Sequence, residues 1–424
     1  MTTTDQFHVL DPARDDSAHA HIAPVPRVSL QAFCETSEVS SLIQGAASDR
    51  RMQKAHVKLH MGGAAAAVEA YREAPTPNII VIESTQDRAG LIGHLDSLSE
   101  YCDAGTKVVV LGRVNDVSLY RDLMARGVSE YLIEPFDVID FVRAISELYA
   151  SPGGQPLGRV ISFYGAKGGV GASSLAHNAA WSISRQFDVA TIVVDMDLGF
   201  GTAGLDFNQD PPQGIADAVY APDRLDTNLV DRLLSKCTDK LSLLAAPATL
   251  DRIYDFEDSA FDALMDVLRA SAPVVILDVP HVWSAWARRM LIGSDEVVIV
   301  AAPDLGNFRN AKNIFDTLRG ARPNDSKPRL AMNFVGVPKR PEIPVSDFAT
   351  QLEIPTCAVV NFEPKLFGTA ANNGQMIGEV DAGNKLVEVI DELARIVMGR
   401  AEIKRAKRAL FNPILDRFMR KKAS

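Results

Sequence analysis

Short apolar runs and longer amphipathic stretches alternate along most of this chain, beginning near residue 27. Short runs rich in Val, Ile and Leu are typical of buried strands, and the stretches between them have the spacing of amphipathic helices. In the first part of the chain the predicted strands are 28–33, 78–82, 107–111 and 130–133, and the predicted helices are 64–72, 89–101, 117–125 and 138–149. Strands that alternate with helices in this way form a parallel sheet covered by helices.

The second part of the chain repeats this alternation with more uniformly apolar strands. They are predicted at 159–163, 191–194, 241–245, 274–277, 297–301 and 329–334. Strands without a polar face are typical of central parallel strands that are buried on both sides. Between the two parts, the segment Ser-Pro-Gly-Gly-Gln-Pro at 151–156 has the composition of a turn-rich linker.

We therefore predict an α/β protein with two parallel-sheet domains, the second of them doubly wound. The predicted segments are a disordered polar lead (1–26), a first domain (27–150), a linker (151–157), a second domain (158–400) and a tail (401–424).

Composition and charge are those of a globular protein of 424 residues, 47% of them hydrophobic and 23% charged. The net charge of −10 argues against a general nucleic-acid binder, and we expect no specific nucleic-acid partner. The four cysteines are scattered, which suits reduced thiols in the cytoplasm. No apolar stretch approaches the ~18–20 residues that span a bilayer, and the first residues lack the pattern of a signal peptide. We expect a cytoplasmic protein whose membrane contacts are peripheral.

One glycine-rich segment carries most of the candidate chemistry. Its sequence over 163–174 is Phe-Tyr-Gly-Ala-Lys-Gly-Gly-Val-Gly-Ala-Ser-Ser, between a predicted strand and a helix predicted at 174–184. Strand, glycine loop and helix together aim backbone N–H groups and a helix N-terminus at a nucleotide phosphate. We predict that this loop holds the nucleotide through Gly165, Ala166, Lys167, Gly168, Gly169, Val170, Gly171, Ala172, Ser173 and Ser174.

Three downstream segments follow this loop in a consistent order. They are Val-Val-Asp-Met-Asp-Leu at 193–198, Val-Val-Ile-Leu-Asp-Val-Pro at 274–280 and Ala-Met-Asn-Phe at 331–334. Each places a polar residue near the carboxyl end of a strand, where the ligands of open α/β sheets gather. Together with Lys-Gly-Gly-Val-Gly at 167–171, they resemble the MinD/ParA class of P-loop ATPases, whose deviant Walker A loop carries a signature lysine.

This resemblance implies roles for individual residues and implies ATP and Mg²⁺ as cofactors. Lys167 would reach across a homodimer to the partner's phosphates, and Asp197 would help to position the attacking water. These two are the catalytic candidates. Ser173 and Asp278 would hold Mg²⁺, in the case of Asp278 partly through water. Asn333 would contact the edge of the adenine.

Ala172 changes the chemistry expected of the loop. It stands where the usual P-loop has a lysine, just before the hydroxyl residue. That lysine supplies positive charge to the β- and γ-phosphates, and the loss of one such preorganised cation costs several kcal/mol of transition-state stabilisation. We therefore expect a weak ATPase at most, or a protein that uses ATP as a dimerising ligand.

The first domain resembles a response-regulator receiver that lacks receiver chemistry. Its landmarks are Pro-Asn-Ile-Ile-Val-Ile-Glu at 77–83 and Ile-Glu-Pro-Phe at 133–136. Glu83 stands where receivers have the phosphorylated Asp, and Glu134 stands where they have a lysine. Receiver phosphorylation needs an Asp nucleophile, an acid-bound divalent metal and a cation. We therefore predict a degenerate receiver that serves as a docking or dimerisation surface. In an alternative interpretation, Glu83 mimics a permanently charged state.

The tail combines basic and apolar residues. Nine basic and two acidic residues lie between 400 and 424, so the rest of the chain is more acidic than the net charge suggests. We predict a short basic amphipathic helix that includes Ile414, Leu415, Arg417, Phe418, Met419, Arg420, Lys421 and Lys422. Such a helix binds anionic membrane surfaces, or it packs on its own domain or on a partner.

A degenerate receiver followed by a MinD/ParA-like ATPase resembles the TadZ/CpaE family of pilus assembly proteins, over roughly 27–399. The resemblance implies a localisation and assembly factor of the Tad (Flp) type IV pilus, often at a cell pole. Such a protein would bind ATP as a homodimer and recruit the pilus secretion ATPase and other assembly components, with peripheral contact to the inner membrane.

Three other functions stay open from the sequence. A cycling MinD-like ATPase that places a flagellum or a division site would need brisk hydrolysis, which Ala172 disfavours. A ParA-like DNA-partitioning protein would need a basic ATPase surface, whereas this domain is acidic outside the tail. A nucleotide-free scaffold would keep the fold and leave the pocket empty.

Overall fold

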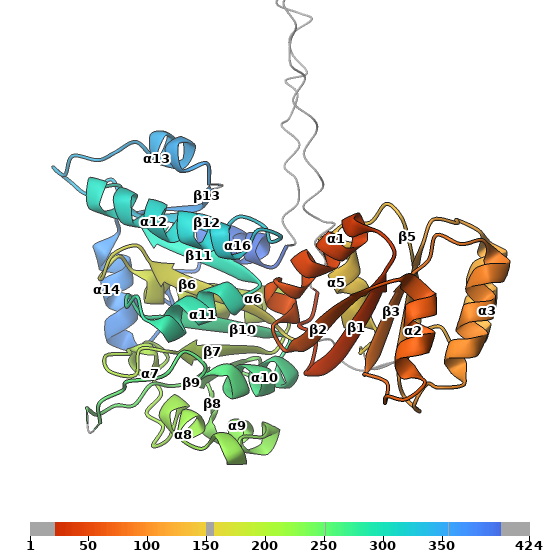
Figure 1. Ribbon diagram of the computed structural model, residues 1–424. Helices are drawn as coiled ribbons and strands as arrows, with labels where there is room; N and C mark the ends of the chain where they lie inside the picture. Colours follow the sequence, from red (N-terminus) through yellow and green to blue (C-terminus); the bar gives the residue numbers. More distant parts are fainter. Residues whose placement is uncertain (1–21, 150–156, 251, 355, 400–424) are drawn as a thin grey trace, which may run out of the picture.

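The computed structural model describes residues 22–149, 157–250, 252–354 and 356–399, which form two α/β units that lie side by side (Figure 1). The predicted linker, apart from Leu157, and the predicted tail at 401–424 lie outside the described residues. No helix in the described ranges has both the length and the apolar character needed to span a bilayer.

The first unit is built on a five-stranded parallel sheet with the order β2-β1-β3-β4-β5. The strands are β1 (Val28–Cys34), β2 (Ala55–Met61), β3 (Ile79–Glu83), β4 (Lys107–Gly112) and β5 (Glu130–Ile133). The four strands expected from the sequence are confirmed, and β2 is an addition. It was not predicted because it is an edge strand whose residues are exposed or half-buried, with His and Lys between its apolar positions.

Helices cover both faces of this sheet. On one face lie α1 (Ser37–Ala47) and α5 (Val138–Glu147), and on the other α2 (Gly63–Tyr71), α3 (Arg88–Ser99) and α4 (Val117–Ala125). Ile22 and Val25 are buried in the core beneath α1 and α5. These two apolar side chains cover the core. The packed part of this domain therefore begins before residue 27, where the sequence predicted it to begin.

The second unit contains an eight-stranded sheet with the order β13-β12-β11-β6-β10-β7-β9-β8. The strands are β6 (Arg159–Gly165), β7 (Thr191–Asp195), β8 (Ser235–Lys236), β9 (Leu241–Leu244), β10 (Val274–Val279), β11 (Glu296–Ala301), β12 (Arg329–Val335) and β13 (Thr356–Asn361). All neighbouring strands are parallel except β8 and β9. The predicted doubly wound α/β fold is confirmed, with β8 and β13 as edge strands that the sequence did not indicate.

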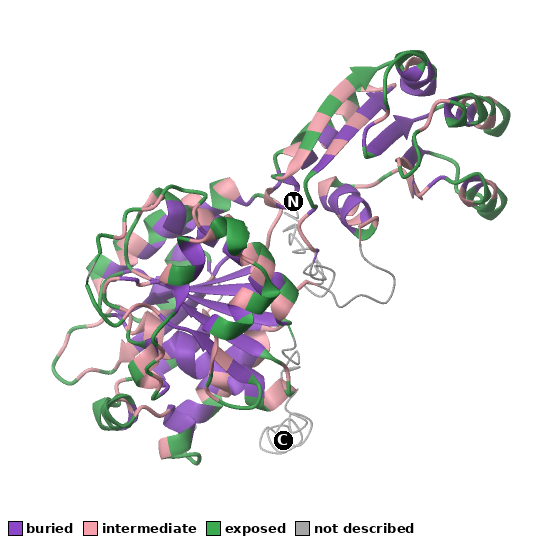
Figure 2. Ribbon diagram, turned by 90° about the horizontal axis from the view of Figure 1, so that it is seen from below, coloured by how far each residue is buried: buried purple, intermediate pink, exposed green. Residues whose placement is uncertain are grey.

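Two layers of helices enclose the second sheet. One layer consists of α6 (Ala172–Phe187), α7 (Ala203–Asp206), α14 (Pro364–Asn373), α15 (Ile377–Val380) and α16 (Lys385–Val397). The other consists of α8 (Ile215–Val219), α9 (Thr227–Leu233), α10 (Asp262–Ser271), α11 (Ala285–Gly293), α12 (Leu305–Ala321) and α13 (Val345–Leu352). The central strands are buried almost along their whole length, and Figure 2 shows them as the enclosed layer of the unit.

A buried ionic network joins the two units. It centres on Arg50 in the short 3₁₀ turn η2 (Arg50–Met52), between α1 and β2. The Nε of Arg50 lies 2.7 Å from Asp325 Oδ2 and its Nη2 lies 3.2 Å from Asp295 Oδ1. All three side chains are more than nine-tenths buried. Burial lowers the pKa of Arg50, but the charges of Asp295 and Asp325 outweigh this effect and raise it above its ordinary value.

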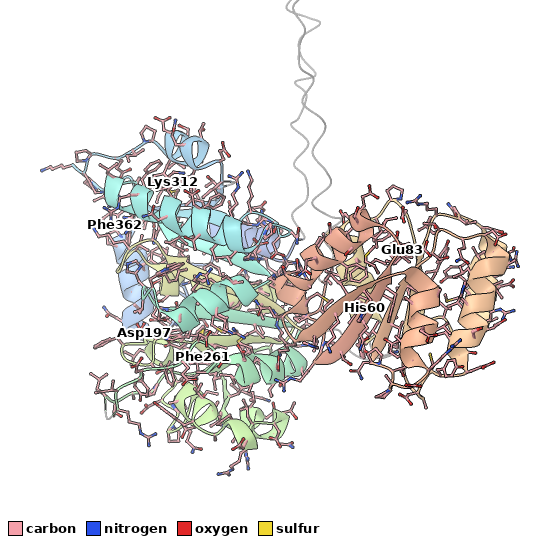
Figure 3. The ribbon with its side chains drawn as sticks, viewed as in Figure 1. His60, Glu83, Asp197, Phe261, Lys312 and Phe362 are labelled. Carbon is pink, nitrogen blue, oxygen red and sulfur yellow. The ribbon has the colours of Figure 1, made fainter. Side chains whose placement is uncertain are left out.

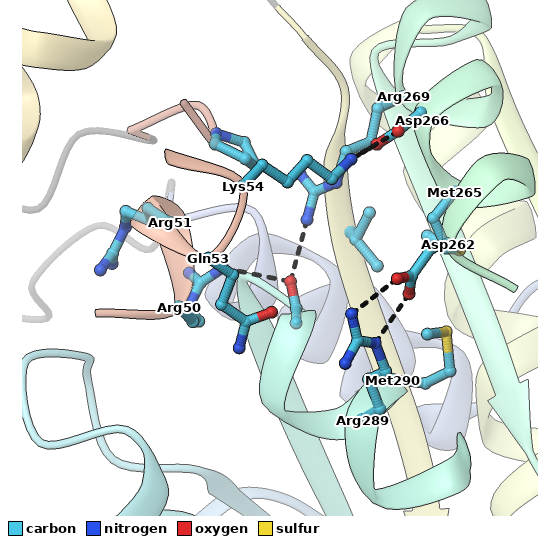
Figure 4. Close-up of a pocket in the computed structure, with 13 residues that line it drawn as sticks. Arg50, Arg51, Gln53, Lys54, Asp262, Met265, Asp266, Arg269, Arg289 and Met290 are labelled. Atoms are coloured by element: carbon cyan, nitrogen blue, oxygen red, sulfur yellow. Dashed lines mark hydrogen bonds and ion pairs between the residues drawn. The ribbon is translucent and has the colours of Figure 1, made fainter. Parts of the chain in front are cut away.

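This interface lies at the amino-terminal edge of the second sheet. Arg50 also donates to the carbonyl oxygen of Gly293, at the end of α11, and Arg269 from α10 donates to the same oxygen (Figure 4). A cavity of about 120 Å³ lies beside these groups, and at its rim Lys54 forms a more exposed ion pair with Asp266. The carboxyl ends of the strands point away from the first unit (Figure 1).

Removing Arg50 should be far more damaging than removing Lys54. Arg50→Ala leaves Asp295 and Asp325 buried near one another with less compensating charge, and we expect it to lower the free energy of unfolding by about 3–5 kcal/mol. Lys54→Ala breaks an exposed pair and should cost less than about 1 kcal/mol. Urea unfolding of the full chain, followed by circular dichroism, measures both. Equal, small effects would show that the network contributes little to the docking of the two units.

Candidate nucleotide-binding site

The register of three parallel strands brings the candidate site residues to one edge of the second sheet. In this register Asp278 of β10 lies opposite Phe163 of β6 on one side and opposite Asp195 of β7 on the other. The glycine-rich loop follows β6 directly, so it lies beside both aspartates. The predicted gathering of polar residues at the carboxyl edge is therefore present.

The glycine-rich loop has the backbone shape of a phosphate cradle. Gly169 and Gly171 adopt left-handed conformations, with φ of 73° and 85°. Gly171 is the N-cap of α6 and makes no side-chain capping hydrogen bond, so the first N–H groups of the helix face the loop without a capping side chain. Successive N–H groups in such a turn, together with the helix dipole, form an anion-binding concavity.

Ser173 and Asp278 lie close enough to share a cation. The hydroxyl of Ser173 donates to Asp278 Oδ1 over 3.1 Å, from the first turn of α6 to the end of β10. A hydroxyl and a carboxylate are the oxygen ligands that Mg²⁺ prefers, and Mg²⁺ completes its shell with phosphate oxygens and water. This pair therefore fits the predicted metal position.

Asn333 has a contact that the sequence did not predict. Its Nδ2 donates to the carbonyl of Val170 over 2.9 Å, and its Oδ1 accepts from the N–H of Phe334. The amide is buried against the loop, and a Cβ on Gly171 would lie only 2.4 Å from Nδ2. Asn333 therefore braces the phosphate loop, while its predicted contact with adenine stays a prediction.

A pocket of about 250 Å³ opens beside Asn333 and Gly171. Its other walls come from the ends of β12 and β13 and from α14, and they include Phe334, Phe362, Glu363 and Phe367. Aromatic walls of this kind suit a nucleobase. These residues were not predicted because no motif marks them, and the pairing of β12 with β13 is needed to bring them beside the loop.

Asp195 and Asp197 take different positions after β7. Asp195 is fully buried and accepts from the N–H groups of Asp197 and Ala203. Burial and the charge of Asp278 raise the pKa of Asp195 to about 7. Asp197 is half-buried and accepts from the N–H of Phe200, and Figure 3 labels it on the side of the second unit that faces away from the first. Its predicted role with water is untested.

Two further side chains hold the start of the loop in place. The imidazole Nδ1 of His281 lies 2.8 Å from the carbonyl oxygen of Gly165, and Asn310 of α12 donates to the carbonyl of Ala166. Lys167 follows these residues and is exposed, and its positive charge helps to lower the pKa of Asp304, the residue before α12. An exposed position is the one that a lysine reaching a second copy needs.

His177 is the main site residue that the sequence did not reveal. It lies on α6 and is fully buried, with Nδ1 2.8 Å from Asp206 and Nε2 3.3 Å from Asp278. Burial lowers its pKa, but hydrogen bonds and charge from these two aspartates outweigh that effect and raise the pKa to about 10. A single His within α6 gave no sequence signal, because its partner Asp206 is 29 residues away.

In the first unit, Glu83 points inward instead of forming a phosphorylation site. Its carboxylate accepts from the N–H groups of Glu35 and Thr36 and from the hydroxyl of Thr36, at 2.7, 2.9 and 2.6 Å. In return, Glu35 accepts from the N–H and hydroxyl of Thr85, just beyond β3. The two loops are therefore tied by reciprocal carboxylate contacts. Figure 3 labels Glu83 within this unit, and its burial favours a structural role over charge mimicry at the surface.

Glu134, the other receiver position named from the sequence, also makes an internal contact, and the neighbouring end of β4 is tightly packed. Glu134 forms an ion pair with Arg113, where the resemblance would require a lysine. The ring of Tyr131 packs so closely on Gly112 that a Cβ there would lie 2.6 Å from its hydroxyl. The predicted degeneracy of this domain is consistent with these contacts.

Comparisons with known proteins identify the chain. CpaE from Caulobacter crescentus, a pilus assembly protein of known structure, is 45% identical to this chain. The match covers 100% of that structure and 31% of this chain, in its N-terminal region, with a TM-score of 0.30. The chain belongs to the CpaE family of pilus assembly proteins.

The second unit of this CpaE family member is similar to ATPases of the MinD/ParA class. A ParA family ATPase from Chlorobium tepidum is 25% identical, with a TM-score of 0.51, and the match covers 56% of this chain and 98% of that one. MinD from Pyrococcus horikoshii, in complex with Mg-ADP, is 16% identical and shares the fold, with a TM-score of 0.50 and coverage of 58% and 100%. None of the protein-family models searched matches the chain.

The crowding at Gly171 predicts that substitution of this glycine destabilises the protein more than substitution of Gly168. Gly171→Ala places a Cβ against Asn333 and forces a left-handed backbone on an alanine, so we expect it to lower stability by about 1–3 kcal/mol. Gly168→Ala meets only an ordinary contact with His281 and should leave the nucleotide-free protein almost unchanged. Thermal unfolding without nucleotide compares the two, and equal midpoints would contradict the described loop.

Proposed function

We propose that this protein is an ATP-dependent localisation and assembly factor of the Tad (Flp) pilus. It binds ATP with Mg²⁺ as a homodimer, hydrolyses the nucleotide slowly or not at all, and recruits the pilus secretion ATPase and other assembly components. The observation that carries the proposal is a loop shaped for a nucleotide in which Ala172 takes the place of the P-loop lysine. Membership of the CpaE family supports the role in pilus assembly.

The geometry of the loop supports nucleotide binding. The N–H groups around Gly171 would hold the phosphates, and Ser173 and Asp278 would hold Mg²⁺. When bound, Mg²⁺ supplies positive charge to the phosphates. The aromatic pocket beside Asn333 would hold the nucleoside. On a similar fold, MinD from P. horikoshii binds Mg-ADP.

Exposed apolar residues around the site support a dimer that closes at this edge of the sheet. Seven large apolar residues in the segments that follow β7, β9, β10 and β11 are each at least half exposed. They are Phe200, Leu205, Leu250, Ile253, Val282, Trp283 and Leu305. Exposed apolar groups gathered around a polar site are typical of interaction surfaces. A second copy that faces this edge would cover them and would place its Lys167 near the phosphates.

Ala172 supports slow hydrolysis. Its methyl group replaces a cation that would otherwise neutralise the phosphates inside each copy. Lys167 from the partner would restore a positive charge only after dimer formation. The nucleotide would thus act mainly as a ligand that holds two copies together, which suits an assembly factor more than a cycling enzyme.

The remaining parts of the protein would connect the dimer to its surroundings. The receiver-like domain would act as a docking surface, and Val114, Val117 and Tyr120 are exposed in and near its helix α4. The basic tail, outside the described residues, would contact the inner membrane at a cell pole.

Nucleotide binding, mass and turnover test this proposal together. With Mg-ATP, we expect the wild-type mass measured by light scattering to double and turnover to stay near zero. Lys167→Ala should bind nucleotide but stay monomeric, and Asp278→Ala should lose the Mg²⁺ dependence of binding. Ala172→Lys should raise turnover by about tenfold or more, because it restores a cation at the phosphates.

The same measurements separate the alternatives. Brisk turnover by the wild type would favour a cycling MinD-like enzyme. Absence of any nucleotide binding would favour a scaffold that keeps only the fold. A Lys167→Ala variant that dimerises as well as the wild type would contradict the face-to-face arrangement.

A further inference from the structure

His177 lies at the centre of three elements of the nucleotide site. It is on α6, one turn beyond Ser173, so both side chains project from the same face of the helix. Its imidazole lies between two carboxylates, with Nδ1 2.8 Å from Asp206 Oδ2 and Nε2 3.3 Å from Asp278 Oδ2. Asp206 is the last residue of α7, and Asp278 belongs to β10.

These contacts fix the orientation of the Asp278 carboxylate. One of its oxygens accepts from Ser173 and the other faces His177. Both groups come from α6, so the carboxylate is held from one helix at two points. A metal-binding carboxylate that is oriented by a second group binds its metal more tightly, and loss of such a group typically costs 10–100-fold in metal affinity.

The same imidazole also links the site to the segment after β7. Asp195 accepts from the N–H of Ala203, at the start of α7, and Asp206 lies at the end of this short helix. The ring of Phe207 packs on His177, with 5.4 Å between ring centroids. A movement of α7 would therefore disturb the contact between His177 and Asp278.

We propose that His177 is a positioning residue that orients Asp278 for the divalent cation and ties this carboxylate to α7 through Asp206. The inference rests on the proposed function, since it concerns Mg²⁺ in a nucleotide site. It goes beyond that proposal because it assigns the metal dependence of binding to a residue outside the glycine-rich loop.

Two conservative substitutions separate the two contacts of His177. In His177→Gln the side-chain amide reaches the position of Nε2 and keeps a donor for Asp278. In His177→Asn the amide lies near the position of Nδ1 and keeps the contact with Asp206. His177→Leu keeps a similar volume and removes both. Ser182→Ala is the matched control, because Ser182 is also buried on α6 but bonds to Asp391, outside the site.

The experiment measures the affinity of the full chain for a fluorescent ATP analogue, first with EDTA and then as Mg²⁺ is added. We expect all variants to bind within about twofold of wild type in EDTA. The Mg²⁺ concentration for half-maximal enhancement should rise about tenfold or more in His177→Leu and His177→Asn. It should rise less in His177→Gln, which keeps a donor for Asp278 but loses the contact with Asp206, and it should stay near the wild-type value in Ser182→Ala.

Asp206→Asn provides a second test in case the substitutions at His177 prevent folding. It weakens the anchor of His177 without altering α6, and it should also raise the Mg²⁺ requirement. Wild-type Mg²⁺ dependence in a folded His177→Leu or Asp206→Asn protein would overturn the inference and leave His177 as a core contact. A wild-type protein that binds no analogue under any condition would instead overturn the proposed function, and the inference with it.

Discussion

Two carboxylates buried side by side are the constraint on which the candidate nucleotide site depends. Asp195 and Asp278 occupy opposite positions on adjacent parallel strands, and both side chains are almost fully excluded from solvent. Buried like charges are costly unless each is hydrogen-bonded or neutralised. The surrounding structure supplies these partners: backbone N–H groups to Asp195, and Ser173 and His177 to Asp278. Such arrangements are typical of functional sites, because buried paired carboxylates do not help a sheet to pack.

The sheet that bears this pair also separates the two ends of the second domain. Its carboxyl edge holds the glycine-rich loop and the exposed apolar residues, and its amino-terminal edge holds the ionic network around Arg50. Helix α11 connects the two edges physically. Its N-cap is Ser284, just after the loop that follows β10, and it ends at Gly293, whose carbonyl accepts from Arg50. The receiver-like domain is therefore docked on the side of the sheet opposite the glycine-rich loop.

Hydrophobic patterns and short motifs predicted the parts of the protein whose structure depends on residues that are near one another in the sequence. Buried strands such as β10 and the glycine loop before α6 have uniform or distinctive sequences, and the structure has them where they were expected. The edge strand β2 was missed because solvent exposure removes its apolar pattern. Glu83 was recognised as a departure from receivers, but its inward orientation depends on backbone N–H groups about 50 positions earlier in the chain. His177 and the brace at Asn333 depend in the same way on contacts between distant segments, which periodicity and motif spacing do not describe.

The most direct test of the central claim is an experimental structure of the full chain with Mg²⁺ and a non-hydrolysable ATP analogue. The account predicts two copies that face each other across the carboxyl edges of their second sheets. Each Lys167 should contact the phosphates bound by the other copy, and Phe200, Trp283 and Leu305 should be buried between them. An analogue held within a single copy, with Lys167 in solvent and these apolar residues still exposed, would contradict the account.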